Sequence, residues 1–207
     1  VDTKKENKLI VHFANELPNN VKSSFTAKVN AVDRKASARN HTGTHLLHES
    51  LRSILGNHVE QKGSLVNPKY LRFDFTHFAK IEKTDLHKIE QDVNAKILAN
   101  IALNEHINLS LKQAEDMGAI MLFGEKYEDI VRMIQFDSSK ELCGGTHVTA
   151  TGEIGLFKIL SEGSTSSGIR RIEATTGVIA LNYLNEKEEL LKTISDLVKR
   201  KDLKKGV

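Results

Sequence analysis

Residues 40–51 read Asn-His-Thr-Gly-Thr-His-Leu-Leu-His-Glu-Ser-Leu, a stretch that combines a helical pattern of leucines with several histidines. Its apolar residues recur at the spacing of an amphipathic helix and continue a little further along the chain: Leu46, Leu47, Leu51, Ile54 and Leu55. The pattern predicts a helix that begins near Asp33, with Asp33 or Ser37 as its cap, and ends at Gly56. We expect its apolar stripe to pack into the core.

Short segments of alternating apolar and polar residues on both sides of this helix predict strands. They are residues 8–13, 25–29, 58–66, 70–75, 107–111, 131–136, 156–160 and 169–174. Two further apolar stripes predict helices, formed by Leu86, Ile89, Val93, Ile97 and Ile101 and by Leu184, Leu191, Ile194 and Val198. The sequence therefore predicts an α+β fold with a mainly antiparallel sheet, a small β-subdomain in front and a C-terminal helix.

Composition and charge favour a globular cytoplasmic protein. Hydrophobic residues make up 39% of the 207 residues, which is enough apolar material for a core. The net charge of +3 remains from 30 basic and 27 acidic residues, so any nucleic-acid surface must be local. No apolar run approaches the ~18 residues of a membrane span, and the amino terminus does not resemble a secretion signal. The missing initiator methionine and the helical, basic end predict that the chain was excised from a longer polypeptide.

Two separate segments carry residues that can ligate a metal. His41 and His45 stand four residues apart on the predicted helix, so both side chains project from one face about one turn apart. Residues 141–147 read Glu-Leu-Cys-Gly-Gly-Thr-His and contain Cys143, the only cysteine, and His147. A single cysteine cannot form an internal disulfide, which leaves a buried hydrophobe, a nucleophile or a metal ligand. The glycine pair lets the backbone turn so that thiolate and imidazole converge on one ion.

Three nitrogens and one sulfur form a set that suits zinc better than magnesium or calcium; they belong to His41, His45, Cys143 and His147. A closed set of four ligands is usual in structural zinc sites, whereas a catalytic site keeps one position for water or substrate. If the site is catalytic, Cys143 would be a ligand in one state and displaced in another. A zinc peptidase is a rival because of residues 45–49, His-Leu-Leu-His-Glu. The helical protease motif, however, has histidines four residues apart with the glutamate beside the first.

Six segments, in order along the chain, resemble the successive signatures of the editing domain of alanyl-tRNA synthetases. They are residues 39–48, 61–66, 71–75, 122–127, 141–148 and 168–174. Threonyl-tRNA synthetases have a related editing module with the same histidine and cysteine spacings. One departure is Thr42-Gly43, where the family more often has Ser-Ala, and Gly43 is expected to loosen the helix by up to ~1 kcal/mol.

The resemblance also implies an organisation in three parts. Residues 1–32 resemble the small β-barrel that precedes editing in these enzymes, residues 33–177 resemble the zinc-dependent editing domain, and residues 178–207 resemble the start of the linker that follows. The aminoacylation domain of the family is absent from this sequence. A free-standing editing factor of the same superfamily is the alternative to an excised fragment.

The resemblance implies hydrolysis of the ester of tRNA(Ala) mischarged with serine, at a zinc site. A pocket sized for alanine excludes serine by a factor of only ~10², so a second, hydrolytic site is needed to remove wrongly attached serine. Thr44 is the implied partner of the serine hydroxyl, although its own hydroxyl can instead bond back to a helix carbonyl. Gln61 is implied to orient a water or the ester carbonyl, with a solvent-facing strand glutamine as the alternative. Cys143 completes the catalytic candidates.

Basic residues are candidates for contacts with tRNA phosphates, which provide affinity without much sequence preference. They are Lys62, Lys69, Arg72, Arg170, Arg171 and the run at residues 199–201. Each of them is otherwise a solvated surface charge, and Arg170 and Arg171 alternate on a strand, so at most one faces the buried side. A zinc-stapled tRNA-binding module without hydrolytic activity remains the alternative to an editing enzyme.

Overall fold

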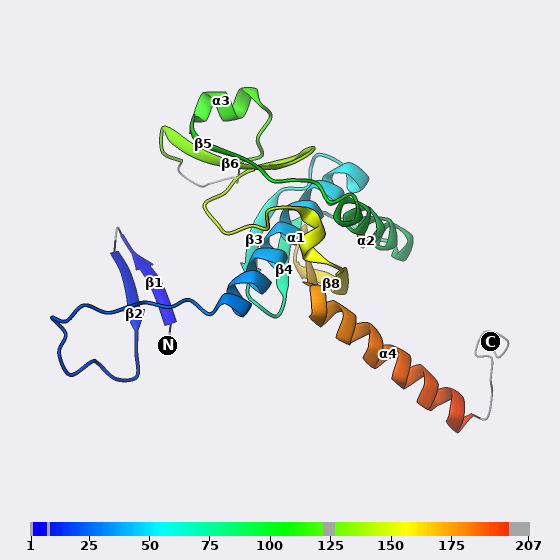
Figure 1. The fold of residues 1–207 in the computed structure, drawn as a ribbon. Helices are drawn as coiled ribbons and strands as arrows, with labels where there is room; N and C mark the ends of the chain where they lie inside the picture. Colours follow the sequence, from blue (N-terminus) through cyan, green and yellow to red (C-terminus); the bar gives the residue numbers. More distant parts are fainter. Residues whose placement is uncertain (1, 8, 122–126, 199–207) are drawn as a thin grey trace. The chain divides into compact units, whose positions relative to one another are not determined.

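The computed structural model describes residues 2–7, 9–121 and 127–198, and the chain divides between Asn30 and Ala31 into two compact units (Figure 1). The expected signature at residues 122–127 lies outside the described residues except for Tyr127, and the basic run at 199–201 lies outside them entirely. The α+β class, the antiparallel sheets and the C-terminal helix are confirmed.

The first unit contains one antiparallel pair of strands, β1 (Asp2–Glu6) and β2 (Leu9–Phe13). The turn between them includes Asn7 in the left-handed region, with a φ of 56°. The strand predicted at residues 8–13 is present, but the one predicted at residues 25–29 is wrong, because that segment forms no strand. The strand that pairs with β2 is instead β1. Its sequence, Asp-Thr-Lys-Lys-Glu, lacks the apolar alternation that predicts a strand.

In the second unit, helix α1 (Ala31–Leu55) carries the predicted leucine stripe. The helix begins before Asp33, so this carboxylate lies in the first turn, where it interacts favourably with the helix dipole, and neither Asp33 nor Ser37 is the cap. Gly56 follows the helix with a φ of 116°, which favours glycine. The stripe is fully buried at Leu46, Leu47 and Leu51.

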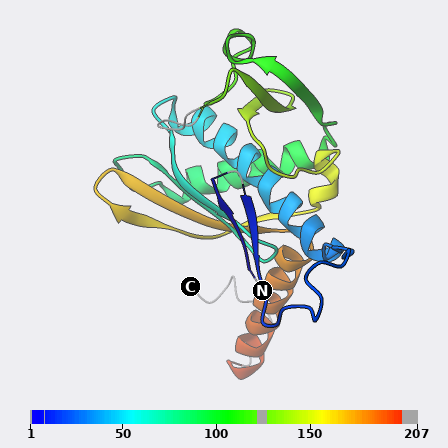
Figure 2. The same cartoon turned by 90° about the vertical axis from the view of Figure 1, so that its left-hand side faces the viewer.

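A four-stranded antiparallel sheet, in the order β3-β4-β9-β8, packs against α1 and α2 (Figure 2). The elements are β3 (Gln61–Val66), β4 (Leu71–Thr76), α2 (Lys83–Leu98), β8 (Phe157–Ser166) and β9 (Ile169–Thr176). The alternation predicted for β4 and the stripe predicted for α2 are confirmed by the burial of Leu71, Phe73, Phe75, Ile89, Val93 and Ile97. The main core thus lies between this sheet and the two helices.

A three-stranded sheet in the order β5-β6-β7 carries the segment with the cysteine. Its elements are β5 (Asn104–Ser110), α3 (Leu111–Asp116), β6 (Ile130–Phe136) and β7 (Ser139–Leu142), and a 3-10 helix η1 (Thr151–Ile154) follows. Neither α3 nor β7 was predicted. Ser110 and Gln113 form a reciprocal capping box at the start of α3, a signal that the strand pattern at residues 107–111 obscured. Because β7 ends at Leu142, it positions Cys143.

Helix α4 (Gly177–Leu197) begins directly after β9. Its predicted apolar face is largely exposed, at 39% for Leu184 and 54% for Leu191, so within the described chain this face has little cover. The division into three parts at residues 32 and 177 remains a prediction. Among the described residues, we find no helix with the length and apolar character that a membrane span requires.

Candidate metal centre

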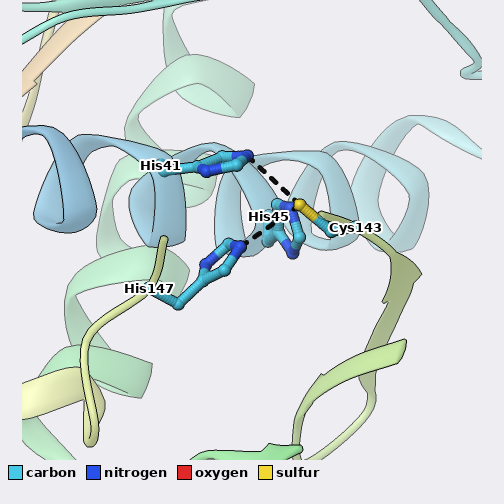
Figure 3. Close-up of side chains that lie close together, drawn as sticks. All are labelled: His41, His45, Cys143 and His147. Atoms are coloured by element: carbon cyan, nitrogen blue, oxygen red, sulfur yellow. Dashed lines mark hydrogen bonds between the residues drawn. The ribbon is translucent and has the colours of Figure 1, made fainter. Parts of the chain in front are cut away.

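Four side chains from two distant segments of the sequence meet at one point (Figure 3). His41 and His45 come from α1, and Cys143 and His147 come from residues 143–147, which we call the diglycine loop. One potential ligand atom of each residue lies within 4.8 Å of those of the other three. The Sγ atom of Cys143 is 3.5 Å from Nε2 of His41 and 3.3 Å from Nε2 of His147. The structure thus brings together all four residues that the spacing indicated.

Arg132 on β6 holds the diglycine loop in place. Its Nη1 atom donates hydrogen bonds to the carbonyl oxygens of Cys143 and Gly145, each at 2.8 Å. Gly145 in turn lies against the ring of His41, where a Cβ atom would be 2.1 Å from Cε1 of the imidazole. The close approach of loop and helix therefore requires glycine at this position. Arg132 could not be predicted from the sequence, because an arginine on a strand belongs to no recognisable ligand motif.

Two polar residues without a role in the sequence prediction orient the histidine rings. The hydroxyl of Thr42 lies 3.0 Å from Nδ1 of His147 and also accepts a hydrogen bond from a backbone amide. The buried carboxylate of Glu141 lies 3.0 Å from Nδ1 of His48 and 3.5 Å from Nε2 of His45. A hydrogen bond to one nitrogen of an imidazole fixes the ring and leaves the other nitrogen for an ion.

Burial keeps the imidazoles of the cluster uncharged. It lowers the pKa of His45 well below the ordinary value, and the neighbouring imidazoles add to this effect. Burial, together with His41 and Arg132, lowers the pKa of His147 to about 3. Burial also lowers the pKa of His41, against the effect of a hydrogen bond with the backbone of Thr146. At neutral pH the three rings are in the form that coordinates a metal.

The donor set fits a zinc ion. Bonds of ~2.3 Å to sulfur and ~2.0 Å to nitrogen that meet at a tetrahedral angle place the two ligand atoms about 3.5 Å apart. The separations of Cys143 from His41 and His147 are close to this value. Nδ1 of His45 is buried and has no hydrogen-bond partner among the described residues, so its lone pair is available to an ion.

The other two catalytic candidates lie in different surroundings. Thr44 is buried, and its hydroxyl donates to the carbonyl oxygen of Asn40 at 2.9 Å, which is the intrahelical bond that the sequence left as the alternative. Gln61 is half-buried at the start of β3 and lines a cavity of about 610 Å³, which we call the Gln61 cavity. His48 lines the same cavity and, through Glu141, connects it to the cluster.

The arginines expected to contact tRNA are held in ion pairs within the sheet. Arg170 is buried and pairs with Glu162. Arg171 donates two hydrogen bonds to the carboxylate of Asp74, at 2.6 and 2.7 Å, and Nε of Arg72 lies 3.7 Å from the same carboxylate. A phosphate could bind these guanidinium groups only in competition with carboxylates that already occupy them. Their role in RNA binding remains a prediction.

Comparison with known proteins places these features in a family. Residues 131–173 match the family described as threonyl and alanyl tRNA synthetase second additional domain. The whole chain is 55% identical over 208 residues to an alanine–tRNA ligase of Flavobacterium psychrophilum and 50% identical over 210 residues to one of Cytophaga hutchinsonii. Over 196 residues, or 95% of the chain, it is 55% identical to an alanine–tRNA ligase of Bacteroides fragilis.

The chain spans about a quarter of the length of these curated relatives, at 23%, 24% and 22% respectively. The family match covers the part of the chain that contains β7, the diglycine loop, β8 and most of β6 and β9. The similarity to the ligases extends over both units of the fold. By these matches, the chain is similar over its whole length to one part of the alanine–tRNA ligases, the part that contains the second additional domain.

Proposed function

We propose that this chain hydrolyses the ester bond of tRNA(Ala) mischarged with serine, at a zinc site formed by His41, His45, Cys143 and His147. The observation that carries the proposal is the convergence of these four side chains within 4.8 Å in a chain whose relatives are named alanine–tRNA ligases. A ligase pocket for alanine excludes serine only weakly, so a separate hydrolytic site has a clear purpose. The parent ligase would supply the ATP-dependent aminoacylation domain, and the setting would be the cytoplasm.

A bound zinc ion would supply Lewis-acid chemistry, which polarises a carbonyl or lowers the pKa of a water. The residues of the chain hold and orient the reactants. Thr42 and Glu141 keep the rings of His147 and His45 in position. In the hydrolysis, a water oxygen forms a bond to the seryl carbonyl carbon and the bond from that carbon to the ribose oxygen breaks. The ribose hydroxyl leaves with a proton, which gives serine and uncharged tRNA.

Thr44 and Gln61 are the residues to which we assign the substrate. The hydroxyl hydrogen of Thr44 is donated to Asn40, so the oxygen of Thr44 can only accept, and the serine hydroxyl is a donor that alanine lacks. Pockets of about 300–1,000 Å³ hold small organic ligands, and the Gln61 cavity of about 610 Å³ falls in this range. It is large enough for the terminal nucleoside of the tRNA, with the Gln61 amide orienting the ester or a water.

The test is to offer purified chain both seryl-tRNA(Ala) and alanyl-tRNA(Ala) and to measure the release of each amino acid. We expect serine to be released at least ~10²-fold faster than alanine, because the discrimination comes from a hydrogen bond that only serine can make. Equal rates for the two substrates would contradict serine-selective editing. No release from either would contradict hydrolysis altogether.

A zinc-stapled tRNA-binding module is the second candidate, and two observations favour it. The four donors form a closed set, which is usual for structural zinc, and the Thr44 hydroxyl is already bonded inside α1. The variants Thr44→Val and Gln61→Ala separate the two functions. A staple tolerates both changes, whereas an editing site loses turnover or selectivity while its zinc content and its unfolding temperature stay the same.

A further inference from the structure

A small cavity next to the metal cluster has three basic side chains in its lining. It has a volume of about 230 Å³ and borders the cluster through Thr146 and His147. Its basic residues are Arg34, Lys35 and Arg39 of α1, and its acidic residue is Glu153. We call it the α1 groove. Three positive charges against one negative charge leave a local excess of +2, in a chain whose total is only +3.

Arg34 belongs to the same helix face as the metal-ligating histidines. Arg34, Ala38, His41 and His45 follow one another at spacings of four, three and four residues, which is one stripe of an α-helix. At ~1.5 Å of rise per residue, Arg34 precedes His41 by about 10 Å along the helix axis. A chain that lies along this stripe would therefore meet the Arg34 guanidinium before it reaches the cluster.

The cations of the groove differ in how strongly they are already engaged. Arg39 is half-buried and donates from Nε to the carbonyl oxygen of Glu153 at 2.8 Å. The carboxylate of Glu153 accepts hydrogen bonds from the side chain and backbone of Thr149, and these bonds, with a smaller effect of Lys35, lower the pKa of Glu153. Arg34 is exposed and has no ion pair among the described residues. This contrasts with the paired arginines of the β4–β9 ladder.

The Gln61 cavity lies at the opposite end of the cluster along α1. The residues that α1 contributes to it are His48 and Arg52, whereas those that α1 contributes to the α1 groove end at Arg39. His41 and His45 therefore lie between the two cavities along α1. The groove has less than half the volume of the Gln61 cavity, and its lining is charged. The larger cavity suits a nucleoside with its amino acid, and the smaller one suits a phosphate.

We propose that the α1 groove binds the phosphates next to the 3′ end of the tRNA, through Arg34 and Lys35, and so directs the aminoacylated end to the metal cluster. This inference rests on the proposed function for the identity of the RNA, but it concerns binding and not hydrolysis. The groove assigns this role to Arg34 and Lys35, which form no salt bridge among the described residues, in place of the paired arginines Arg170 and Arg171. Phosphate contacts of this kind add affinity and position the strand without reading its bases.

The test compares the double variant Arg34→Ala/Lys35→Ala with the control variant Lys83→Ala/Lys112→Ala. The control removes the same net charge from exposed positions on α2 and α3. The probe is uncharged tRNA(Ala), and its dissociation constant is measured by titration at several salt concentrations. Zinc content is measured in parallel to confirm that both variants keep the cluster.

For the groove variant, we expect binding weaker by roughly tenfold or more, and a plot of log affinity against log salt whose slope is smaller by about 1.5 to 2. The control should match the unmodified chain. A groove variant that binds with the affinity and slope of the control would overturn the inference, and so would an unmodified chain that binds no tRNA. If the slope changes as expected but seryl-tRNA is not hydrolysed, the groove stands and the proposed function fails.

Discussion

The carboxylate of Glu141 joins His45 of the cluster to His48 at the Gln61 cavity. We expect Glu141→Gln to weaken zinc binding by ~10–100-fold, because an amide orients the imidazole less strongly than a carboxylate does. Competition with a chelator measures this change. Glu162→Gln is the matched control, since Glu162 is an equally buried carboxylate that pairs with Arg170. If Glu141→Gln binds zinc no worse than this control, Glu141 does not position His45.

The two glycines of the diglycine loop provide a second test at this scale. A Cβ atom at Gly145 would lie 2.1 Å from Cε1 of His41, whereas a Cβ atom at Gly144 meets nothing within 4 Å. We expect Gly145→Ala to displace either His41 or the loop and to abolish tight zinc binding, and Gly144→Ala to leave it intact. Isothermal titration of both metal-free variants with zinc is the measurement. Equal affinities would show that the loop and helix do not approach as described.

The residues that could be predicted from the sequence are those whose spacing carries the information. His41 and His45 share a helix face, and Cys143 and His147 share one short loop, so each pair is visible without a fold. Thr42 and Arg132 act on partners that the fold brings to them, and threonines and arginines are too common for a single one to indicate a role. For Thr44 the sequence allows two partners of the hydroxyl, a substrate or a carbonyl oxygen of the helix, and only the structure identifies the bond to Asn40.

Helices α1 and α2 are joined by a polar contact whose strength should depend on pH. Asp92 accepts hydrogen bonds from Ser50, at 2.6 Å, and from Lys96, which also pairs with Glu49. Burial alone would raise the pKa of Asp92, but the bonds from Lys96 and Ser50 outweigh it and lower the pKa. A carboxyl whose pKa is lowered by folding stabilises the fold above its ordinary pKa of 3.8, and this contribution is lost as the pH falls through the folded value.

We therefore expect Asp92→Asn to lower the free energy of unfolding at neutral pH by about 1 kcal/mol or less, because 39% of the Asp92 side chain is exposed and solvent screens the pair. The difference from the unmodified chain should shrink below pH 3.8. Urea unfolding at pH 7 and pH 3 measures it. Asp85→Asn, which removes a more exposed pair with Lys88 on the same helix, is the control. A deficit that grows in acid would contradict this account.

Elements with a strong apolar period were predicted well, and elements that depend on pairing or capping were not. The apolar stripes of α1 and α2 and the alternation of β4 are patterns of the local sequence, so they can be recognised without the fold. In contrast, β1 is a charged segment that is a strand only because β2 lies beside it, and residues 25–29 alternate but have no partner strand. The short helix α3 depends on its capping box, which a search for periodicity does not detect.

Removal of the metal tests how the whole molecule depends on the cluster. The main core lies between α1, α2 and the four-stranded sheet and includes Leu46, Phe73 and Phe157, all fully buried, so it does not need the ion in order to form. We expect the chelated protein to stay folded and to unfold cooperatively at a lower temperature. Zinc at ~1,000 times its dissociation constant should restore about 4 kcal/mol. Complete unfolding on chelation would mean that the ion holds the fold together.

At the scale of the whole molecule, the sequence predicted the α+β class and the antiparallel sheets, because alternating and helical periods identify most elements. It did not predict the order β3-β4-β9-β8, since pairing between distant strands leaves no mark on the local pattern. Nor did it identify the α1 groove, whose members come from α1 and from residues that follow β7. Surfaces of this kind exist only after the chain has folded.

The most direct test of the four-residue zinc site is to measure the zinc content and the zinc affinity of the purified chain, and to compare the unmodified protein with the variant Cys143→Ser. Cys143 is the one sulfur donor of the cluster and lies within 3.5 Å of two of its histidines. The account predicts one tightly bound zinc ion per chain and much weaker binding in the variant. A chain that purifies without zinc and does not take it up, or a variant that binds zinc as tightly as the original, would contradict it.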